Sequence, residues 1–511
     1  MSSAPGQAEQ AERDDIAALA KGGRANVFGF LLRLAARIPF LFIAGRLYGA
    51  SVLGRFAYAV LVIEFAAQLA TFGLKRGLAE QLAREDSRQQ SHIVADAMML
   101  CLVGSAATAG LLMLFPAAMF PNSGLNGLDR LLPLIVIAIA LTDVALAACA
   151  YQYNIAASVH ARSIVEPWTI SIASLGFYFY SARDGLILSY VAAMLAAMLA
   201  ALWPLLRHYG LPRGWSPHPG RLWWLAVRNL PLAAADAIEW GTRRLDLAIL
   251  GLFATPSVVG IYYVAQQVAS LPQKLKTSFE PILGPVITRN LKTRNYQAIA
   301  RQVSQVGFWI VAAQLGVALA LGIPGEAVMG LVGPSFVAGT GALACLLAAE
   351  VMAAPSVVSE AALVYLARLR NLSLSVATIA LQALLTLGMI VGAGRLGFPE
   401  MVVAAMPAAA LALALTCSSI VKSWLLGRLL GTRIAIWRAS LIVCGLAVTI
   451  VGTVLTLLPP HYEWVELLFG IPAMLLIYSA IVWKVAFRPA DRTLFRKRKG
   501  AATPDGLTGK V

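Results

Sequence analysis

The chain has 511 residues, of which 59% are hydrophobic, and a mean hydropathy of +0.75. A soluble globular protein is usually about 45–50% apolar, so this composition excludes that class. The formal net charge of +16 could suggest nucleic-acid binding, but the basic residues are concentrated in alternate loops. An anionic membrane surface is a sufficient partner for such loops, and we expect no nucleic-acid partner.

Apolar runs of roughly 20 residues, the length that crosses a bilayer as a helix, follow one another along the chain. They predict an all-α polytopic membrane protein with about 14 transmembrane helices. The expected spans are 26–47, 53–73, 93–119, 130–153, 163–181, 185–206, 226–253, 258–288, 303–323, 337–366, 371–393, 399–425, 437–458 and 463–486.

A faint internal duplication divides the chain. The stretch from Gly45, G-R-L-Y-G-A-S-V-L-G-R-F-A-Y-A, is echoed from Gly251 as G-L-F-A-T-P-S-V-V-G-I-Y-Y-V-A, at one offset and without a gap. Gly54 matches Gly260 in this alignment. Internal repeats of membrane transporters place the substrate site between the halves. We therefore expect each half to begin with one helix–turn–helix unit, and the site to lie between the halves.

Basic residues occupy every second loop. These loops hold Lys75, Arg76, Arg84 and Arg88; Arg207, Arg213 and Arg221; Arg289, Lys292, Arg294 and Arg301; Arg368 and Arg370; and Lys422, Arg428, Arg433 and Arg438. By the positive-inside rule these loops and both termini are expected to be cytoplasmic. Lys75 and Arg46 lie at span ends, where snorkelling to the interface is the expected role.

Each charged side chain at mid-membrane costs about 2.5–3.5 kcal/mol. Charged residues inside the apolar segments are therefore the ones that indicate function. Arg33 and Arg37 share one helix face with Asn26 in the first span. A water-filled cavity or a bound anion would offset their cost. The alternative is that the two arginines only pack or snorkel.

Polar faces recur in later spans. They comprise Glu64, Gln68, Thr71 and Lys75 in the second span; Asp236, Glu239, Arg243 and Asp246 in the seventh; and Ser270, Lys274 and Thr277 in the eighth. Asp143, Glu166, Glu350 and Glu360 are isolated acids in other spans. The seventh-span set could instead be a self-neutralising patch that steadies helix packing.

No catalytic or nucleotide-binding motif is present: the sequence has no Walker motif, no G-x-S-x-G and no His/Cys cluster. The five cysteines all lie in apolar segments without a C-x-x-C pair, as expected of small packing residues. We expect no enzyme activity, cofactor or metal.

Two regions resemble a known family. One is Gly45–Gly73 followed by Leu74-Lys75-Arg76, and the other runs from Asn229-Leu230-Pro231 through Leu245-Asp246 and Leu250-Gly251 to Val259-Gly260-Ile261-Tyr262. Together they are similar to the polysaccharide flippases of the multidrug/oligosaccharidyl-lipid/polysaccharide exporter superfamily.

The resemblance implies two pseudo-symmetric six-helix bundles around a central cavity that work by alternating access. The last two spans have no duplicate; an extra pair of this kind is seen in the related lipid II flippases. The expected segments are a cytoplasmic tail (1–25), an N-terminal six-helix bundle (26–206), a cytoplasmic linker (207–225), a C-terminal six-helix bundle (226–430), an additional helix pair (437–486) and a basic cytoplasmic tail (487–511).

The resemblance further implies movement of an undecaprenyl-diphosphate-linked oligosaccharide from the cytoplasmic to the periplasmic leaflet of a bacterial inner membrane, for surface polysaccharide such as lipopolysaccharide or exopolysaccharide. First-helix arginines of the lipid II flippases face the cavity, which makes Arg33 and Arg37 candidates. The expected substrate-binding residues are Arg33, Arg37, Arg243, Lys274, Gln68, Tyr263, Gln266 and Gln267. The expected charge-pairing or ion-coupling residues are Glu64, Asp143, Asp236, Glu239 and Glu350.

A coupling proton or sodium ion and glycan-assembly proteins are further candidate partners. Two alternatives stay open: a cation-coupled multidrug exporter of the same superfamily, and an integral-membrane glycan polymerase or ligase. The first would favour an acidic cavity, and the second would commonly need a larger outer-face domain than the short intervening loops provide.

Overall fold

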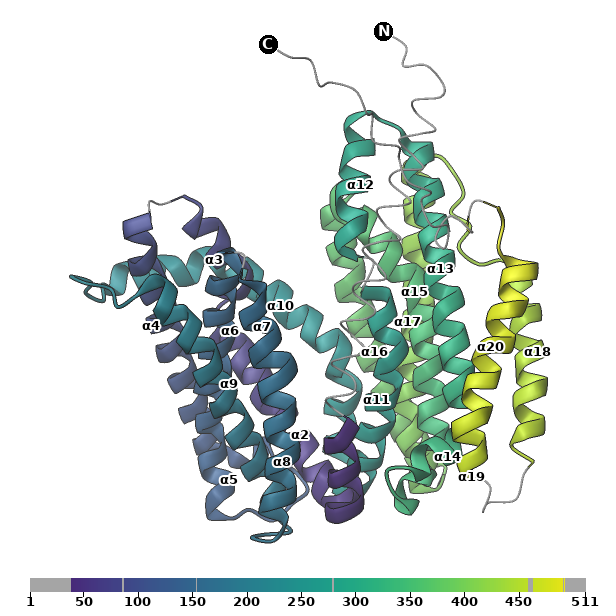
Figure 1. The fold of residues 1–511 in the computed structure, drawn as a ribbon, viewed down its shortest axis with the longest axis horizontal. Coiled ribbons are helices and arrows are strands. Elements are labelled where there is room, and N and C mark those ends of the chain that lie inside the picture. The colour runs from purple at the N-terminus through teal and green to yellow at the C-terminus, as the bar shows by residue number, and fades with distance from the viewer. Residues whose placement is uncertain are drawn as a thin grey trace, which may run out of the picture.

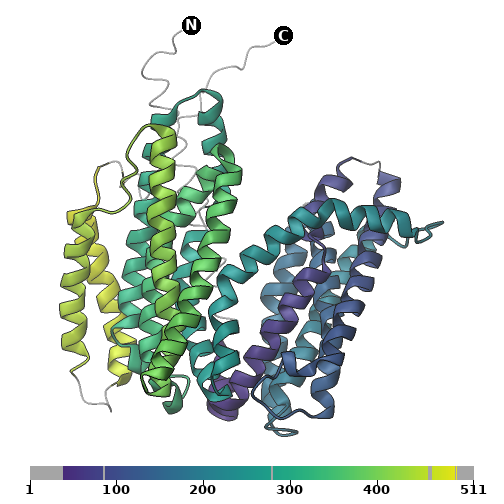
Figure 2. The same ribbon diagram turned by 180° about the vertical axis from the view of Figure 1, so that it is seen from behind.

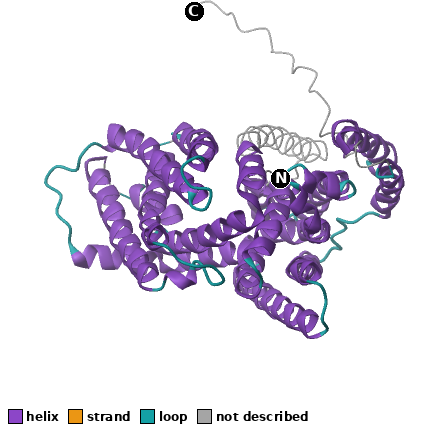
Figure 3. Ribbon diagram, turned by 90° about the horizontal axis from the view of Figure 1, so that it is seen from below, coloured by secondary structure: helices purple, strands orange, loops and turns teal. Residues whose placement is uncertain are grey.

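The computed structural model describes residues 38–84, 87–152, 154–277, 280–457, 463–489 and 491. Within these residues every regular element is a helix, as the view from below shows (Figure 3). Nine of the described helices are long and apolar enough to cross a membrane, and Ala439–Leu455 is a shorter apolar helix. The predicted all-α polytopic membrane fold is therefore confirmed.

The helices form two lobes and a separate pair (Figure 1). The N-lobe contains α2 (Gly49–Ala70), α3 (Leu74–Leu82), α4 (Ser87–Leu114), α5 (Gly127–Leu131), α6 (Ile135–Tyr151), α7 (Ile155–Val159), α8 (Glu166–Tyr178) and α9 (Gly185–Tyr209). The C-lobe contains α11 (Pro256–Thr277), α12 (Glu280–Lys292), α13 (Tyr296–Gly322), α14 (Gly325–Gly330), α15 (Thr340–Leu366), α16 (Arg368–Arg395) and α17 (Glu400–Leu430). The C-terminal pair, α18 (Ala439–Leu455) and α19–α20 (Glu463–Val465 and Ile471–Ile481), packs on α13.

One long helix, α10 (Pro219–Phe253), runs between the lobes (Figure 2). It contacts α3 and α4 of the N-lobe and α16 and α17 of the C-lobe. The linker was expected to extend to residue 225, but α10 begins at Pro219, because proline is favoured in the first turn of a helix, where its missing N–H is not needed. Although α10 and α11 are long enough to span a membrane, they are more polar than the nine apolar helices.

The two copies of the duplicated segment pack against each other where α2 crosses α11. A Cβ atom on Gly54 would lie 1.7 Å from the carbonyl oxygen of Pro256, and one on Gly260 would lie 2.0 Å from that of Ala50. Gly54 matches Gly260 and Ala50 matches Pro256 at the same offset, so the contact is reciprocal, as in a two-fold interface. The backbones can approach this closely only because both positions lack a side chain.

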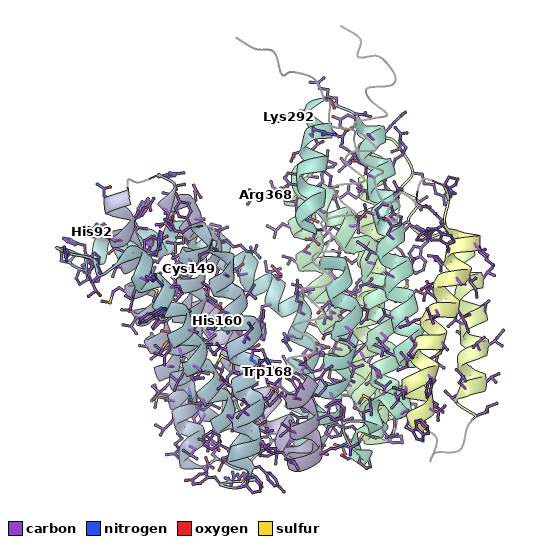
Figure 4. All side chains as sticks on the ribbon, in the orientation of Figure 1. His92, Cys149, His160, Trp168, Lys292 and Arg368 are labelled. Atoms are coloured by element: carbon purple, nitrogen blue, oxygen red, sulfur yellow. The ribbon has the colours of Figure 1, made fainter. Side chains whose placement is uncertain are left out.

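Further contacts join the lobes beside this crossing. The amide of Asn122 donates hydrogen bonds to the carbonyl oxygens of Gly251 (3.0 Å) and Ala254 (2.9 Å) at the end of α10. The Nε of Arg46 donates to the carbonyl oxygen of Leu331 at 3.0 Å. We call this end of the molecule the closed end. The lobes diverge from it toward the opposite end, where Lys292 and Arg368 lie; we call that the basic end (Figure 4).

Gly54→Ala and Gly260→Ala are each expected to destabilise the protein by about 1–3 kcal/mol, because a methyl group at either position overlaps backbone of the facing helix. Thermal unfolding of the purified protein measures the effect. Gly110→Ala and Gly388→Ala are matched controls, since a Cβ there meets nothing within 4 Å. Equal melting temperatures for the four variants would show that α2 and α11 can move apart without loss of stability.

Candidate functional site

A cluster of exposed ion pairs lies where α3 meets α10. The Nε of Arg76 lies 2.8 Å from Asp236 Oδ1, and its Nη2 pairs with Glu239. Glu239 also accepts from Nη2 of Arg243 at 3.0 Å. The side chains of Arg76, Glu239 and Arg243 are 50%, 48% and 41% exposed, whereas that of Asp236 is 5% exposed. One accessible carboxylate is thus shared between two accessible guanidinium groups.

A second cluster lies inside the N-lobe and is better shielded. Asp143 of α6 forms ion pairs with the ammonium group of Lys75, at 3.0 Å, and with the guanidinium group of Arg162. Arg162 also pairs with Glu166 at 2.8 Å, one helical turn on. Lys75 donates to the amide oxygen of Gln68 at 3.2 Å. Two cations from different elements therefore converge on Asp143, whose side chain is only 15% exposed.

Asp246 is fully buried between α10 and α11. The hydroxyl of Tyr262 donates to it at 2.6 Å, and the amide of Gln266 donates at 3.2 and 3.3 Å. Gln266 in turn accepts from Arg244 at 3.4 Å, and Arg244 lies 4.0 Å from Glu64 of α2. This chain of contacts connects a buried carboxylate of the C-terminal half to an exposed one of the N-lobe.

The structure brings most of the expected charge-pairing residues into these clusters. Arg243 and Glu239 meet directly, while Glu64, Asp143 and Asp236 pair with other cations. Tyr263, Gln267 and Glu350 are half-buried on α11 and α15. Arg33, Arg37 and the side chain of Lys274 lie outside the described residues.

Arg76, Arg162 and Arg244 belong to these clusters but were not predicted from the sequence, and the prediction for Lys422 was wrong. Both Arg76 and Lys75 were expected in a cytoplasmic loop, with Lys75 snorkelling to the interface. Their acidic partners, Asp236 and Asp143, lie on other helices, and the spacing of residues along one helix does not reveal such partners. Arg162 precedes Glu166 by four residues, a helical ion-pair spacing that could have identified it. Lys422 is not a loop residue: it lies within α17, 4% exposed, with its Nζ 2.9 Å from Glu360.

Asp143→Asn is expected to destabilise the protein by about 2–3 kcal/mol, because it leaves the shielded Arg162 and Lys75 without their common anion. Arg84→Gln is the control: its pair with Glu80 is 59% exposed on both sides, so the change should be within about 1 kcal/mol. Chemical unfolding of both variants measures the difference, and a smaller effect for Asp143→Asn than for Arg84→Gln would contradict the assignment.

No known family profile and no curated protein matches the sequence. Solved structures do match the fold. The lipid II flippase MurJ in an inward closed conformation has a TM-score of 0.66 at 12% identity, over 90% of this chain and 99% of that one. An inward-facing transporter of the multidrug resistance MATE family has a TM-score of 0.59 at 12% identity, over 78% of this chain and 98% of that one.

The MATE transporter belongs to the multidrug/oligosaccharidyl-lipid/polysaccharide (MOP) exporter superfamily. A third match is a MOP superfamily transporter from Pyrococcus furiosus. Its TM-score is 0.54 at 12% identity, over 82% of this chain and 96% of that one. At these identities the likeness concerns the fold, and it extends over almost the whole length of each matched structure. The chain is a multi-pass membrane protein with the fold of the MOP superfamily transporters.

Proposed function

We propose that the chain is a flippase that moves an undecaprenyl-diphosphate-linked oligosaccharide between membrane leaflets by alternating access. The observation that carries the proposal is the sharing of Glu239 between Arg76 and Arg243. All three side chains are about half exposed, on helices of a protein that is otherwise strongly apolar. Such an arrangement suits an anionic group.

Weak pairing makes the arginines available to a substrate. Ion pairs at exposed positions typically contribute about 0–1 kcal/mol, so little is lost when Glu239 gives up a partner. Hydrogen bonds from guanidinium groups to phosphate oxygens are charge-assisted and often bidentate. A diphosphate can therefore replace the carboxylate as the partner of Arg243, while Asp236 continues to hold Arg76. Lys274, Arg33 and Arg37 are proposed as further contacts for the diphosphate.

The remaining predicted residues have distinct proposed roles. Gln68, Tyr263, Gln266 and Gln267 supply amide and hydroxyl groups for sugar hydroxyls. Glu64, Asp143 and Glu350 are proposed to balance the cations or to bind a coupling proton or sodium ion. If the basic end faces the cytoplasm of a bacterium, as the positive-inside rule expects, exporting about two negative charges gains on the order of 4–5 kcal/mol per 100 mV.

The fold supports movement between two states. The lobes are joined at the closed end and diverge toward the basic end (Figure 1), and two matched structures are described as inward closed or inward-facing. The first of these is a flippase of lipid II, and the second is a transporter. We propose that the lobes rock about the α2–α11 crossing, so that the ion-pair cluster opens alternately to each side.

A multidrug exporter is the second candidate, and one observation favours it. Glu64 and Glu239 are 38% and 48% exposed, so they would also suit a cationic drug once their arginines move away. The Pyrococcus furiosus transporter is described as having a binding pocket of reverse polarity, which suggests a different function for that protein. The charge of the substrate therefore distinguishes the two candidates.

A deletion strain tests which substrate is moved. Accumulation of a lipid-linked glycan precursor supports the flippase, and sensitivity to cationic drugs without such accumulation supports the exporter.

Arg243→Ala is expected to lower surface glycan export about tenfold or more at equal protein level, because one charge-assisted contact contributes about 1.5–3 kcal/mol. Arg243→Lys keeps the charge and should retain part of the export. Arg243 is the better target than Arg76, whose loss would leave the buried Asp236 without a cation. Arg395→Ala, at an exposed end of α16, is the control.

The same assay applies to Arg37→Ala and Arg37→Lys, which test a first-span arginine. We expect the alanine variant to lose export and the lysine variant to keep part of it. Export at the level of the unchanged protein from Arg37→Ala and Arg243→Ala together would falsify the assignment of arginines to the diphosphate.

A further inference from the structure

A cavity of about 990 Å³ lies at the basic end of the C-lobe, apart from the ion-pair cluster of α3 and α10. Its walls come from the first turns of α13, from the connection between α17 and α18 (residues 431–438), and from residues 485–488 and Asp491, at and after the last described helix (Val482–Ala486). These elements stand on the side of the C-lobe that faces away from the N-lobe (Figure 1). The cavity is therefore separated from the proposed substrate path by the body of the C-lobe.

The lining is strongly basic, with four arginines, Arg301, Arg433, Arg438 and Arg488, against the single acid Asp491. Arg438 has a structural role. It donates to Asp491 at 2.6 Å and to the carbonyl oxygen of Ala486 at 3.0 Å, and it stacks on the ring of Phe308 at 3.6 Å. This leaves the cavity with an excess of positive charge.

Arg433 and Arg488 are the accessible cations of the cavity. Both are exposed, and neither is paired with a carboxylate in the part of the chain that the structure describes. They approach the cavity from two different segments, the α17–α18 connection and the chain after the last helix. Two guanidinium groups on separate walls of one cavity are suited to grip a phosphate between them.

One neutral feature of the lining also favours an anion. α18 begins at Ala439 without a side-chain cap, and Ala439 and Ser440 line the cavity. The N–H of Leu441 already donates to the carbonyl oxygen of Arg438 at 2.9 Å, so the N–H groups of Ala439 and Ser440 are the helix donors available to a negative group.

The surroundings indicate that this phosphate is carried by a lipid. The outer face of α18 presents Ile442, Val443, Leu446 and Ile450, all between 57% and 67% exposed, on the turns that follow the cavity along this helix. Trp437, a residue type enriched at membrane interfaces, is 43% exposed in the lining. A headgroup in the cavity would leave its acyl chains free to lie along this apolar face.

We propose that this cavity binds the phosphate of an anionic glycerophospholipid from the leaflet at the basic end. Basic pockets between transmembrane helices are a recurrent form of headgroup site, and the cytoplasmic leaflet is the one that presents anionic lipid. The bound lipid bridges α13, the 431–438 connection and the residues after the last helix. It thereby holds the C-terminal pair against the C-lobe.

Native mass spectrometry of the full chain in detergent, titrated with phosphatidylglycerol or phosphatidylcholine, tests the proposal. Arg433→Gln combined with Arg488→Gln should weaken phosphatidylglycerol binding roughly 30-fold. The matched control is Arg130→Gln combined with Arg395→Gln, which removes the same charge from exposed positions elsewhere. Both double variants should melt at the temperature of the unchanged protein without lipid, since none of the four side chains makes an ion pair in the described residues.

Each outcome decides the matter. Preferential binding of phosphatidylglycerol that is lost in the Arg433/Arg488 variant and kept in the control supports the site. Equal affinity for phosphatidylcholine, or equal loss in both variants, overturns it. Displacement by millimolar inorganic phosphate would assign the cavity to a soluble anion instead. Preference for a polyisoprenyl diphosphate would make it a substrate contact. Because the readout is binding alone, failure of this proposal is distinguishable from failure of the proposed transport function.

Discussion

The rest of the structure depends on the close crossing of α2 and α11. Neither helix could approach the other's backbone with a side chain at Gly54 or Gly260. In a bilayer, where lipid tails are as apolar as the helix surfaces, such close packing is a main source of attraction between helices. The crossing and the contacts beside it join the lobes at the closed end, and the lobes diverge from there (Figure 1), with α10 running between them. The reciprocal contacts also show that the two halves meet through equivalent surfaces.

The carboxylates of the site fall into two kinds, those shielded from solvent and those accessible to it. Asp143 and Asp246, which are shielded, have two or more donors each, while Glu239, which is accessible, holds exposed arginines. A carboxylate that is removed from water needs firm partners, because an unpaired charge in a low-dielectric interior is costly. An accessible one can exchange partners at little cost. The three clusters together therefore combine firmly held carboxylates with one whose partners can be replaced.

Much of the fold could be predicted from the sequence, since the length and polarity of each apolar run report directly on its ability to span a membrane. The duplication matched Gly54 with Gly260, and the structure shows that these two glycines are where α2 and α11 cross. The site was predicted less completely. Helical spacing reveals partners on one helix, as with Glu239 and Arg243, but it does not reveal partners on another helix. Arg76, Arg244 and Lys422 are of the second kind, and the positive-inside pattern assigned two of these three to loops.

The path of α10 has a mechanical consequence. Its early turns are locked to α3, because Gly73, in the left-handed conformation at φ +71°, and Gly77 press against Ala233 and Asn229. Its last turn accepts hydrogen bonds from Asn122 of the N-lobe, and the same helix also contacts α16 and α17 of the C-lobe. Asp236, Glu239 and Arg243 lie on the turns between Asn229 and this last turn. Because one helix touches both lobes and carries these side chains, a change in the angle between the lobes is mechanically linked to a change of ion-pair partners along α10.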